Sequence, residues 1–191
     1  SNGYKEVAFL NRGYSNENPR IYYFGLTLNI YENQLFVGCT SGNTTGAAKI
    51  LVFQEDSDGK WESQTESITP TLRSSGTWTG AIPQIKFQGN KAVIYPRSST
   101  TSNDEVQIIG KDEQGLWSDA NGNPHLETRF SPPCCTTGSH LGFGTRASWN
   151  CEDLVISDSN SNTIWHYKVD CPEGTEDSTP TPVPQPIPTP T

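Results

Sequence analysis

The side chains best suited to chemistry in this sequence are carboxylates and amides in two short runs. Residues 119–123 (Asp-Ala-Asn-Gly-Asn) and 158–162 (Asp-Ser-Asn-Ser-Asn) place oxygen atoms at alternate positions, as calcium-binding loops do at their start. Neither run has the downstream glutamate that completes such a loop, and both fall where the strand pattern requires a turn. The sequence therefore predicts turns and no cofactor, with calcium as the disfavoured alternative.

The sequence does not present the spacing of a nucleophilic or acid–base site. The three histidines (125, 140 and 166) have no His-x-x-x-His spacing, there is no Gly-x-Ser-x-Gly elbow, and Gly138-Ser-His140 lacks a third partner in order. Nothing in the spacing of the carboxylates singles out a glycosidase pair. We therefore expect no catalytic residue and no enzyme activity, and a glycoside hydrolase fragment is the least favoured alternative.

The five tryptophans suggest packing more than ligand binding. Trp61, Trp117 and Trp149 recur at equivalent places in a repeated strand pattern, where packing between sheets would use them. Trp78 lies between small polar residues in the segment 75–80 and has no such place. We expect Trp78 to be an exposed ligand contact. The alternative function, a carbohydrate-binding module, depends on this residue.

The five cysteines match neither a zinc site nor a redox pair, because no Cys-x-x-Cys occurs. In an acidic chain rich in Ser and Thr they are typical of disulfides in an oxidising compartment. Cys151 and Cys171 flank the last hairpin and could staple it, but the pairing stays open and the odd count leaves one over. The disulfide candidates are Cys39, Cys134, Cys135, Cys151 and Cys171.

Charge and hydropathy narrow the class of partner. The net charge of −8 and the absence of a Lys/Arg cluster disfavour nucleic acid, and no apolar stretch is long enough to span a bilayer. The 191-residue chain begins at Ser1 and contains no Met, so we interpret it as a segment of a longer precursor. We expect it to be extracellular or on a cell surface.

The elements that must position any site are strands in a repeat of about 60 residues. A Phe-Gly pair (24–25 and 143–144) has its glycine ten residues before an apolar triplet (35–37 and 154–156). The middle copy keeps the triplet 92–94 but has Ala81-Ile82 in place of Phe-Gly. Alternating side chains between these landmarks indicate half-buried strands joined by hairpins. We predict an all-β domain, residues 1–172, of three antiparallel meanders at about 20–65, 78–120 and 141–170, with 4–10 as a candidate closing strand.

This pattern resembles the FG-GAP repeat, the blade unit of a group of β-propellers. The first copy is the best match, with Phe24-Gly25, residues 35–39 (Leu-Phe-Val-Gly-Cys), 50–53 (Ile-Leu-Val-Phe) and 59–61 (Gly-Lys-Trp). The resemblance implies propeller blades, but three are too few to close a conventional ring. It therefore predicts an open propeller or one completed by a neighbour. The segments 31–34, 88–91 and 150–153 stand where the family's metal-binding form has an Asp-rich loop and lack its ligands, so a calcium site is not implied.

Residues 173–191 form a tail of different composition. Proline at alternate positions predicts an extended polyproline II segment that cannot join a sheet. Thr179, Thr181, Thr189 and Thr191 are candidate O-glycosylation sites, and Asn43 in Asn-Thr-Thr is a candidate N-glycosylation site.

Together these observations predict a non-enzymatic structural or adhesive module of a glycosylated surface protein. An incomplete blade count, a stiff spacer and unclosed sheet edges indicate a unit of a fibre or array. The expected partners are copies of the chain, joined head to tail, or adjacent segments of the precursor.

Overall fold

The described part of this protein is built from strands. The computed structural model describes residues 21–41, 46–58, 61–71, 78–79, 81–96, 105–131, 143–150, 152–158 and 162–169. The strands in this part are β1 (Ile21–Tyr31), β2 (Gln34–Ser41), β3 (Ala48–Glu55), β4 (Trp61–Ile68), β5 (Pro83–Gln88), β6 (Lys91–Pro96), β7 (Val106–Gly110), β8 (Leu126–Phe130), β9 (Phe143–Trp149), β10 (Asp153–Asp158) and β11 (Thr163–Lys168).

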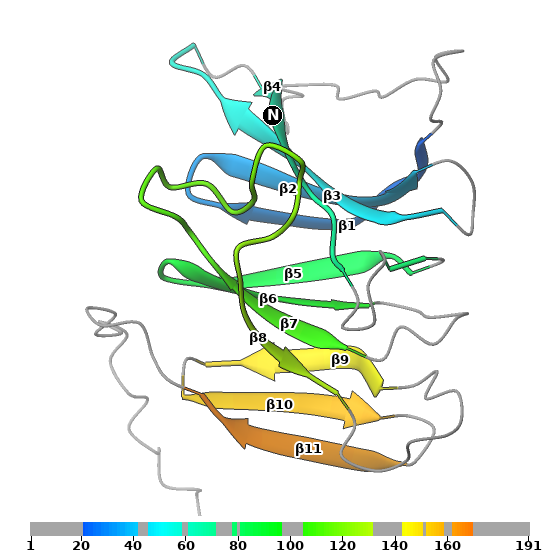
Figure 1. The fold of residues 1–191 in the computed structure, drawn as a ribbon. Coiled ribbons are helices and arrows are strands. Elements are labelled where there is room, and N and C mark those ends of the chain that lie inside the picture. Colours follow the sequence, from blue (N-terminus) through cyan, green and yellow to red (C-terminus); the bar gives the residue numbers. More distant parts are fainter. Residues whose placement is uncertain are drawn as a thin grey trace, which may run out of the picture.

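The strands form three antiparallel sheets that follow one another along the chain. The first sheet has the order β1-β2-β3-β4, the second β5-β6-β7-β8 and the third β9-β10-β11. The sheets lie face to face in chain order, as the blue, green and orange layers of Figure 1 show. This confirms the predicted all-β fold of three antiparallel meanders, and the stack is open and not closed into a ring.

The second sheet ends later than the sequence pattern indicated. Its fourth strand, β8, comes after the segment 111–125, which is a long connection with tight turns. The expected end of the second meander, at about residue 120, therefore falls within that connection. The candidate closing strand at 4–10 and the tail 173–191 lie outside the described residues.

The connection 111–125 contains the first of the two runs with oxygen atoms at alternate positions, residues 119–123. The Asp119 carboxylate accepts hydrogen bonds from the Asn121 and Asn123 backbone N–H groups, both at 2.8 Å, and from the Asn123 side-chain amide at 2.8 Å. These bonds hold the pKa of Asp119 below its usual value, with the Asn123 side chain as the largest cause. The predicted turn is confirmed at this run. Most of the second run, 158–162, lies outside the described residues.

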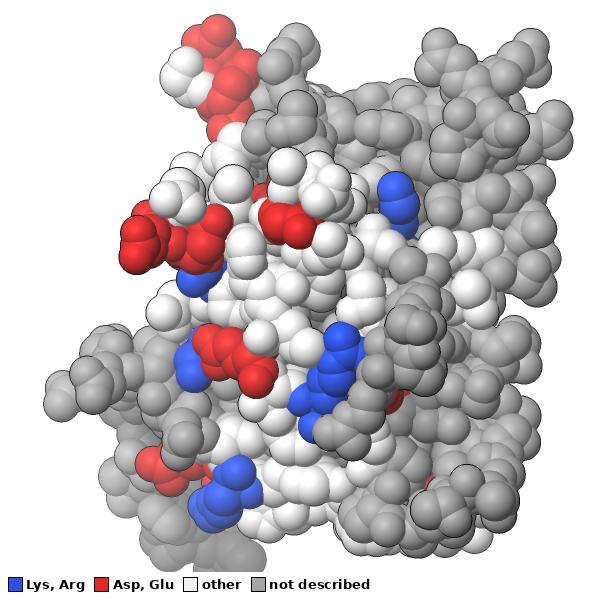
Figure 2. All heavy atoms as spheres, viewed as in Figure 1, with Lys and Arg blue, Asp and Glu red and all other residues white. Residues whose placement is uncertain are grey.

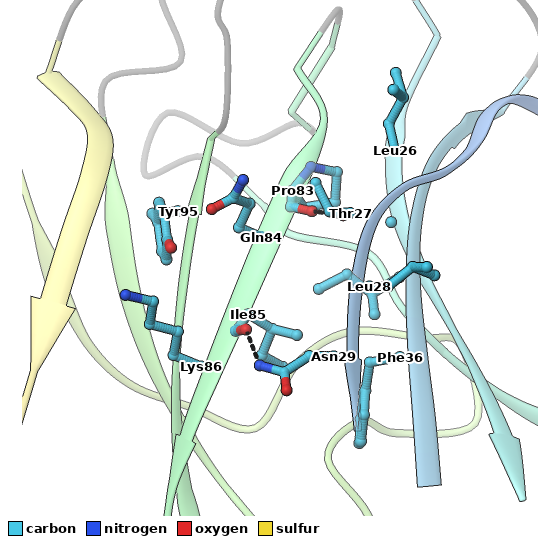
Figure 3. Close-up of a pocket in the computed structure, with 12 residues that line it drawn as sticks. Leu26, Thr27, Leu28, Asn29, Phe36, Pro83, Gln84, Ile85, Lys86 and Tyr95 are labelled. Atoms are coloured by element: carbon cyan, nitrogen blue, oxygen red, sulfur yellow. Dashed lines mark hydrogen bonds between the residues drawn. The ribbon is translucent and has the colours of Figure 1, made fainter. Parts of the chain in front are cut away.

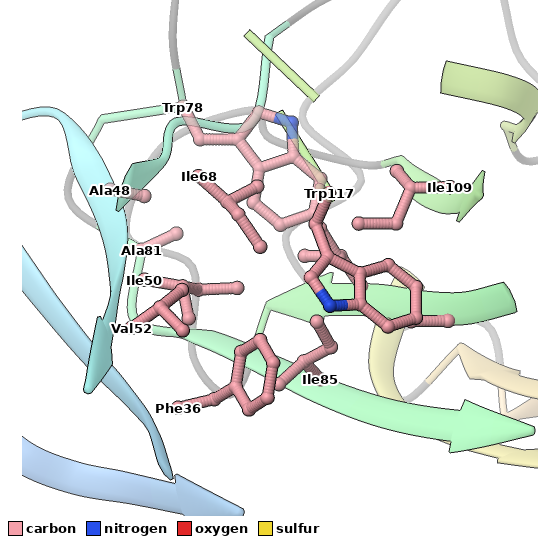
Figure 4. Packing of buried hydrophobic residues seen from close by; sticks show 12 residues of the cluster. Phe36, Ala48, Ile50, Val52, Ile68, Trp78, Ala81, Ile85, Ile109 and Trp117 are labelled. Atoms are coloured by element: carbon pink, nitrogen blue, oxygen red, sulfur yellow. The ribbon is translucent and has the colours of Figure 1, made fainter. Parts of the chain in front are cut away.

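The main hydrophobic core lies between the first and second sheets. One face of the first sheet packs on the facing side of the second sheet. The strands that form this core have apolar residues at alternate positions, so their apolar side chains lie on the same face of the sheet. Figure 4 shows the Trp78 and Trp117 rings among the aliphatic side chains of both sheets. The buried members of this core are Phe36, Ala48, Ile50, Val52, Ile68, Trp78, Ala81, Ile85, Ala92, Ile94, Ile109 and Trp117.

Trp78 is therefore not an exposed contact, and that prediction was wrong. Trp78 is 0% exposed. Its backbone N–H donates to the Pro70 carbonyl at 3.0 Å, and its backbone carbonyl accepts from the Ala48 N–H at 2.7 Å. The small polar neighbours of Trp78 in the sequence are typical of a surface loop, and this led to the wrong prediction. The indole supplies the apolar surface that those neighbours lack, and it fills the space between the sheets.

Two further clusters flank the main core. One lies between the second and third sheets, where the buried residues are Val93, Tyr95, Val106, Ile108, Phe143, Ala147, Leu154 and Ile156. The other lies on the face of the first sheet turned away from the second, and its buried residues are Val37, Cys39, Leu51 and Phe53. The first sheet thus has apolar residues on both faces.

Polar contacts also fix the second sheet to the first at β4, the last strand of the first sheet. The Glu66 carboxylate on β4 accepts from the Trp117 N–H at 2.6 Å and the Ser118 N–H at 3.0 Å. The Thr69 N–H donates to the Gly122 carbonyl at 2.8 Å. The connection 111–125 is therefore bound to the first sheet, although it belongs to the second.

Candidate functional site

The first strand of each sheet in chain order is an edge strand of that sheet, and we call β1, β5 and β9 the inner strands. Three side chains of β1 donate hydrogen bonds to backbone carbonyls on the edge of the second sheet. Thr27 Oγ1 donates to the Pro83 carbonyl (2.6 Å), Asn29 Nδ2 to Ile85 (2.8 Å) and Tyr31 OH to Gly89 (2.7 Å). Figure 3 shows the Asn29 amide directed at the Ile85 carbonyl. An edge strand that would otherwise expose unsatisfied carbonyls is covered by side chains.

The second and third sheets repeat this contact. Lys86 Nζ on β5 donates to the Ala147 carbonyl on β9 at 3.0 Å. Donor and acceptor are separated by 56 to 61 residues in all four bonds, close to the length of the sequence repeat. The inner strands β1 and β5 therefore each donate side-chain hydrogen bonds to the next sheet.

The strand pairing shows which positions of the three inner strands are equivalent. Leu28, Ile85 and Ala147 each pair with the third residue of the apolar triplet on the following strand. By the same count Asn29, Lys86 and Ser148 pair with its middle residue, and Ile30, Phe87 and Trp149 with its first. Asn29 and Lys86 are donors to the next sheet, while Ile85 and Ala147 are the acceptors one repeat later.

The two ends of the stack lack one half of this contact each. On β1, Leu28 is 63% exposed, whereas the equivalent Ile85 and Ala147 are 7% and 6% exposed. Ile30 is also 63% exposed, whereas the equivalent Phe87 and Trp149 are half-buried. We call Leu26, Leu28 and Ile30 the β1 stripe. Its side chains point away from the second sheet because they alternate with Thr27, Asn29 and Tyr31.

The Phe-Gly motif gives the same result from the backbone. Gly25 and Gly144 both have positive φ, 82° and 76°, a conformation that favours glycine. A Cβ at Gly144 would lie 2.8 Å from Val106 Cγ2 of the second sheet, whereas one at Gly25 would meet nothing within 4 Å. The third sheet is packed against its predecessor at this point, and the first sheet is not.

The opposite end of the stack presents mainly polar side chains, apart from Ile164 on β11, which is 72% exposed. The outer face of the third sheet carries Arg146 and Ser148 on β9, both exposed, and Asp153 beside His166 and Lys168. Hydrogen bonds from Lys168 and then His166 hold the pKa of Asp153 below its usual value. Ser148 occupies the position at which Asn29 and Lys86 donate to the next sheet.

A cavity of about 250 Å³ opens between the inner strands β1 and β5. The apolar core residues in its wall are Phe36, Ile50 and Ile85, and the polar ones include Asn29, Gln84, Lys86 and Tyr95. Burial raises the pKa of the Tyr95 hydroxyl, and the Lys86 ammonium lies 5.9 Å from the Tyr95 ring centroid. The residues around the cavity are Leu26, Thr27, Leu28, Asn29, Phe36, Gly38, Ile50, Pro83, Gln84, Ile85, Lys86 and Tyr95.

Charge does not single out another surface on the face shown in Figure 2. Acidic and basic side chains are interspersed over it, and a broad neutral area lies between them. Within the described residues there is no group of three or more His, Cys, Asp or Glu that could hold a metal ion. In the same part of the chain, no helix is long and apolar enough to cross a membrane.

The site residues expected from sequence are only partly within the described residues. Cys39 is buried on β2 beside Val37 and Phe53, while Cys134, Cys135, Cys151 and Cys171 lie outside, so the disulfides stay a prediction. Asn43, Thr179, Thr181, Thr189 and Thr191 also lie outside. Trp78 is in the core between the first and second sheets.

Sequence reasoning missed the inner-strand contact. Its signal was present, because the positions 29, 86 and 148 are all polar donors next to apolar residues. Aligning the repeats on the apolar triplets alone did not show that these side chains point at the next sheet.

Comparison with protein-family models, with curated proteins and with solved structures found no match for this chain.

Proposed function

We propose that this chain is a non-enzymatic extracellular module with a structural or adhesive role, the repeating unit of a glycosylated surface fibre or array. We further propose that its three sheets are blades of the FG-GAP type. The observation that carries the proposal is the uncovered end of the first sheet. Leu28 and Ile30 are exposed at positions where the next sheet has Ile85 and Phe87 packed against its predecessor.

Exposed aliphatic side chains on an edge strand are a recognised liability in a protein that has no partner. A long apolar edge recruits other chains, and proteins that stay monomeric place charges, proline or a covering segment there. The β1 stripe has none of these substitutions over residues 26–30. A second chain that covers the β1 stripe would account for these exposed apolar side chains.

The remaining sequence features agree with this role. The candidate glycosylation sites, the cysteines and the Thr/Pro tail are typical of surface proteins in an oxidising environment. The carbohydrate-binding alternative loses its principal contact, because the Trp78 ring is buried.

Sedimentation velocity of the purified chain over a wide concentration range tests the proposal. We expect species larger than the 21.0 kDa monomer that increase with concentration, and electron micrographs that show rings or filaments. A chain that stays monomeric at the highest concentration, with no assembled species in micrographs, would contradict it.

A further inference from the structure

We propose that the partner of the β1 stripe is a second copy of this chain, which docks head to tail through the inner strand β9 of its third sheet. This inference rests on the proposed function and names the contact that joins the copies. The two ends of the stack are complementary halves of one interface that already occurs twice within the chain.

The first half of the interface is the acceptor end. In both internal contacts one carbonyl that accepts a side-chain hydrogen bond belongs to the position equivalent to Leu28, namely Ile85 and Ala147. The apolar side chains at and beside that position are buried by the donating sheet. At Leu28 the apolar side chain is present and exposed, so the acceptor end is ready for a donor strand.

The second half is the donor end. Two of the positions that face the next sheet on each inner strand are Thr27 and Asn29, then Gln84 and Lys86, then Arg146 and Ser148. All six side chains can donate hydrogen bonds. Thr27 and Asn29 of β1 and Lys86 of β5 contact the following sheet, whereas Arg146 and Ser148 occupy the equivalent positions at the end of the described stack.

The contact is confined to the inner strands. On the first sheet, Val37, Leu51 and Phe53 of the neighbouring strands are already buried, so β1 is the part left to cover. On the third sheet, His166 and Lys168 of β11 are charged or polar, and the equivalent region of the other two sheets is an apolar core. A docked copy would leave these charges in water, where they cost no desolvation.

A head-to-tail contact uses two different surfaces of the same chain. It repeats from copy to copy and generates a filament unless the rotation between copies closes a ring. Two different substitutions, one at each end, can therefore separate this contact from a two-fold symmetric one.

The experiment uses Leu28→Glu to block the acceptor end and Ser148→Glu to block the donor end. Both residues are exposed, so folding should be retained, and circular dichroism checks this. Leu116→Glu is the matched control, because Leu116 is 44% exposed in the connection 111–125 and belongs to neither end.

We expect wild type and Leu116→Glu to associate in sedimentation velocity, and each blocked variant to be monomeric alone. An equal mixture of the two blocked variants should form a complex of one copy of each, because one intact acceptor end meets one intact donor end. A blocked variant that still assembles, or a mixture that stays monomeric, would overturn this inference while the association of wild type upholds the proposed function. A monomeric wild type would overturn both.

Discussion

Glu66 is the residue whose ionisation couples most directly to the packing of the first two sheets. Burial raises its pKa above the usual value of 4.5, and the hydrogen bonds from the Trp117 and Ser118 N–H groups only partly offset this. Protonation therefore favours the folded state. The stabilisation is complete below the unfolded pKa, and it is lost as the pH rises through the folded pKa.

Glu66→Gln removes this titration and keeps an oxygen that can accept from the two N–H groups. We expect the unfolding free energy of Glu66→Gln, relative to wild type, to increase as the pH rises from about 4.5. Urea denaturation at several pH values from acid to neutral measures the difference. Parallel curves for the two proteins would show that Glu66 is not desolvated in the folded state.

Asn29 tests the inner-strand contact at a single bond. Asn29→Ala leaves the half-buried Ile85 carbonyl without its donor, and we expect a loss of about 1 kcal/mol of unfolding free energy. Ser148→Ala changes the equivalent residue on the exposed face and should cost less than about 0.5 kcal/mol. Equal losses at the two positions, measured by urea denaturation of monomer, would contradict the equivalence.

At the scale of elements, the close approach of the first sheet to β5 depends on Gly38 of β2. A Cβ at Gly38 would collide with Thr27 Oγ1 and lie 2.5 Å from the Pro83 carbonyl oxygen, which are the two atoms of an inner-strand hydrogen bond. The Val-Gly pair of the first repeat is thus explained by packing between sheets. No positive φ is involved at this glycine.

Gly38→Ala should therefore lower the unfolding free energy by about 1–3 kcal/mol, as overpacking does. Gly110→Ala is the control on β7, because a Cβ there would meet only the carboxylate end of Glu127, which can move aside. We expect a cost below about 1 kcal/mol for the control, including any effect on the partly exposed Lys91–Glu127 ion pair. Thermal denaturation of the two variants gives the comparison.

Most strands could be predicted from sequence because they alternate apolar and polar residues between hairpin residues. β8 could not, since Leu126, Glu127 and Thr128 are all exposed and its five residues show no buried face. Trp78 was misplaced for a related reason. The polarity of the neighbouring residues does not predict the burial of Trp78, because its single large ring fills the space between two sheets.

At the scale of the whole molecule, the sequence indicated an incomplete propeller but not which surface is incomplete. That information is in the burial of equivalent residues. The inner strand of the first sheet keeps an apolar stripe uncovered, and the inner strand of the third sheet exposes Arg146 and Ser148, so the stack has two different ends. Neither end can be identified from one repeat, because the same residue types are buried in one sheet and exposed in another.

The measurement that tests the account most directly compares Leu28→Ala with Ile85→Ala in urea denaturation, at a dilution where sedimentation shows monomer. These residues are equivalent, but only Ile85 is covered by a preceding sheet. We expect Ile85→Ala to cost about 2–5 kcal/mol and Leu28→Ala less than about 0.5 kcal/mol. If Leu28→Ala costs the monomer as much as Ile85→Ala, the first sheet is already covered within its own chain, and no partner is required.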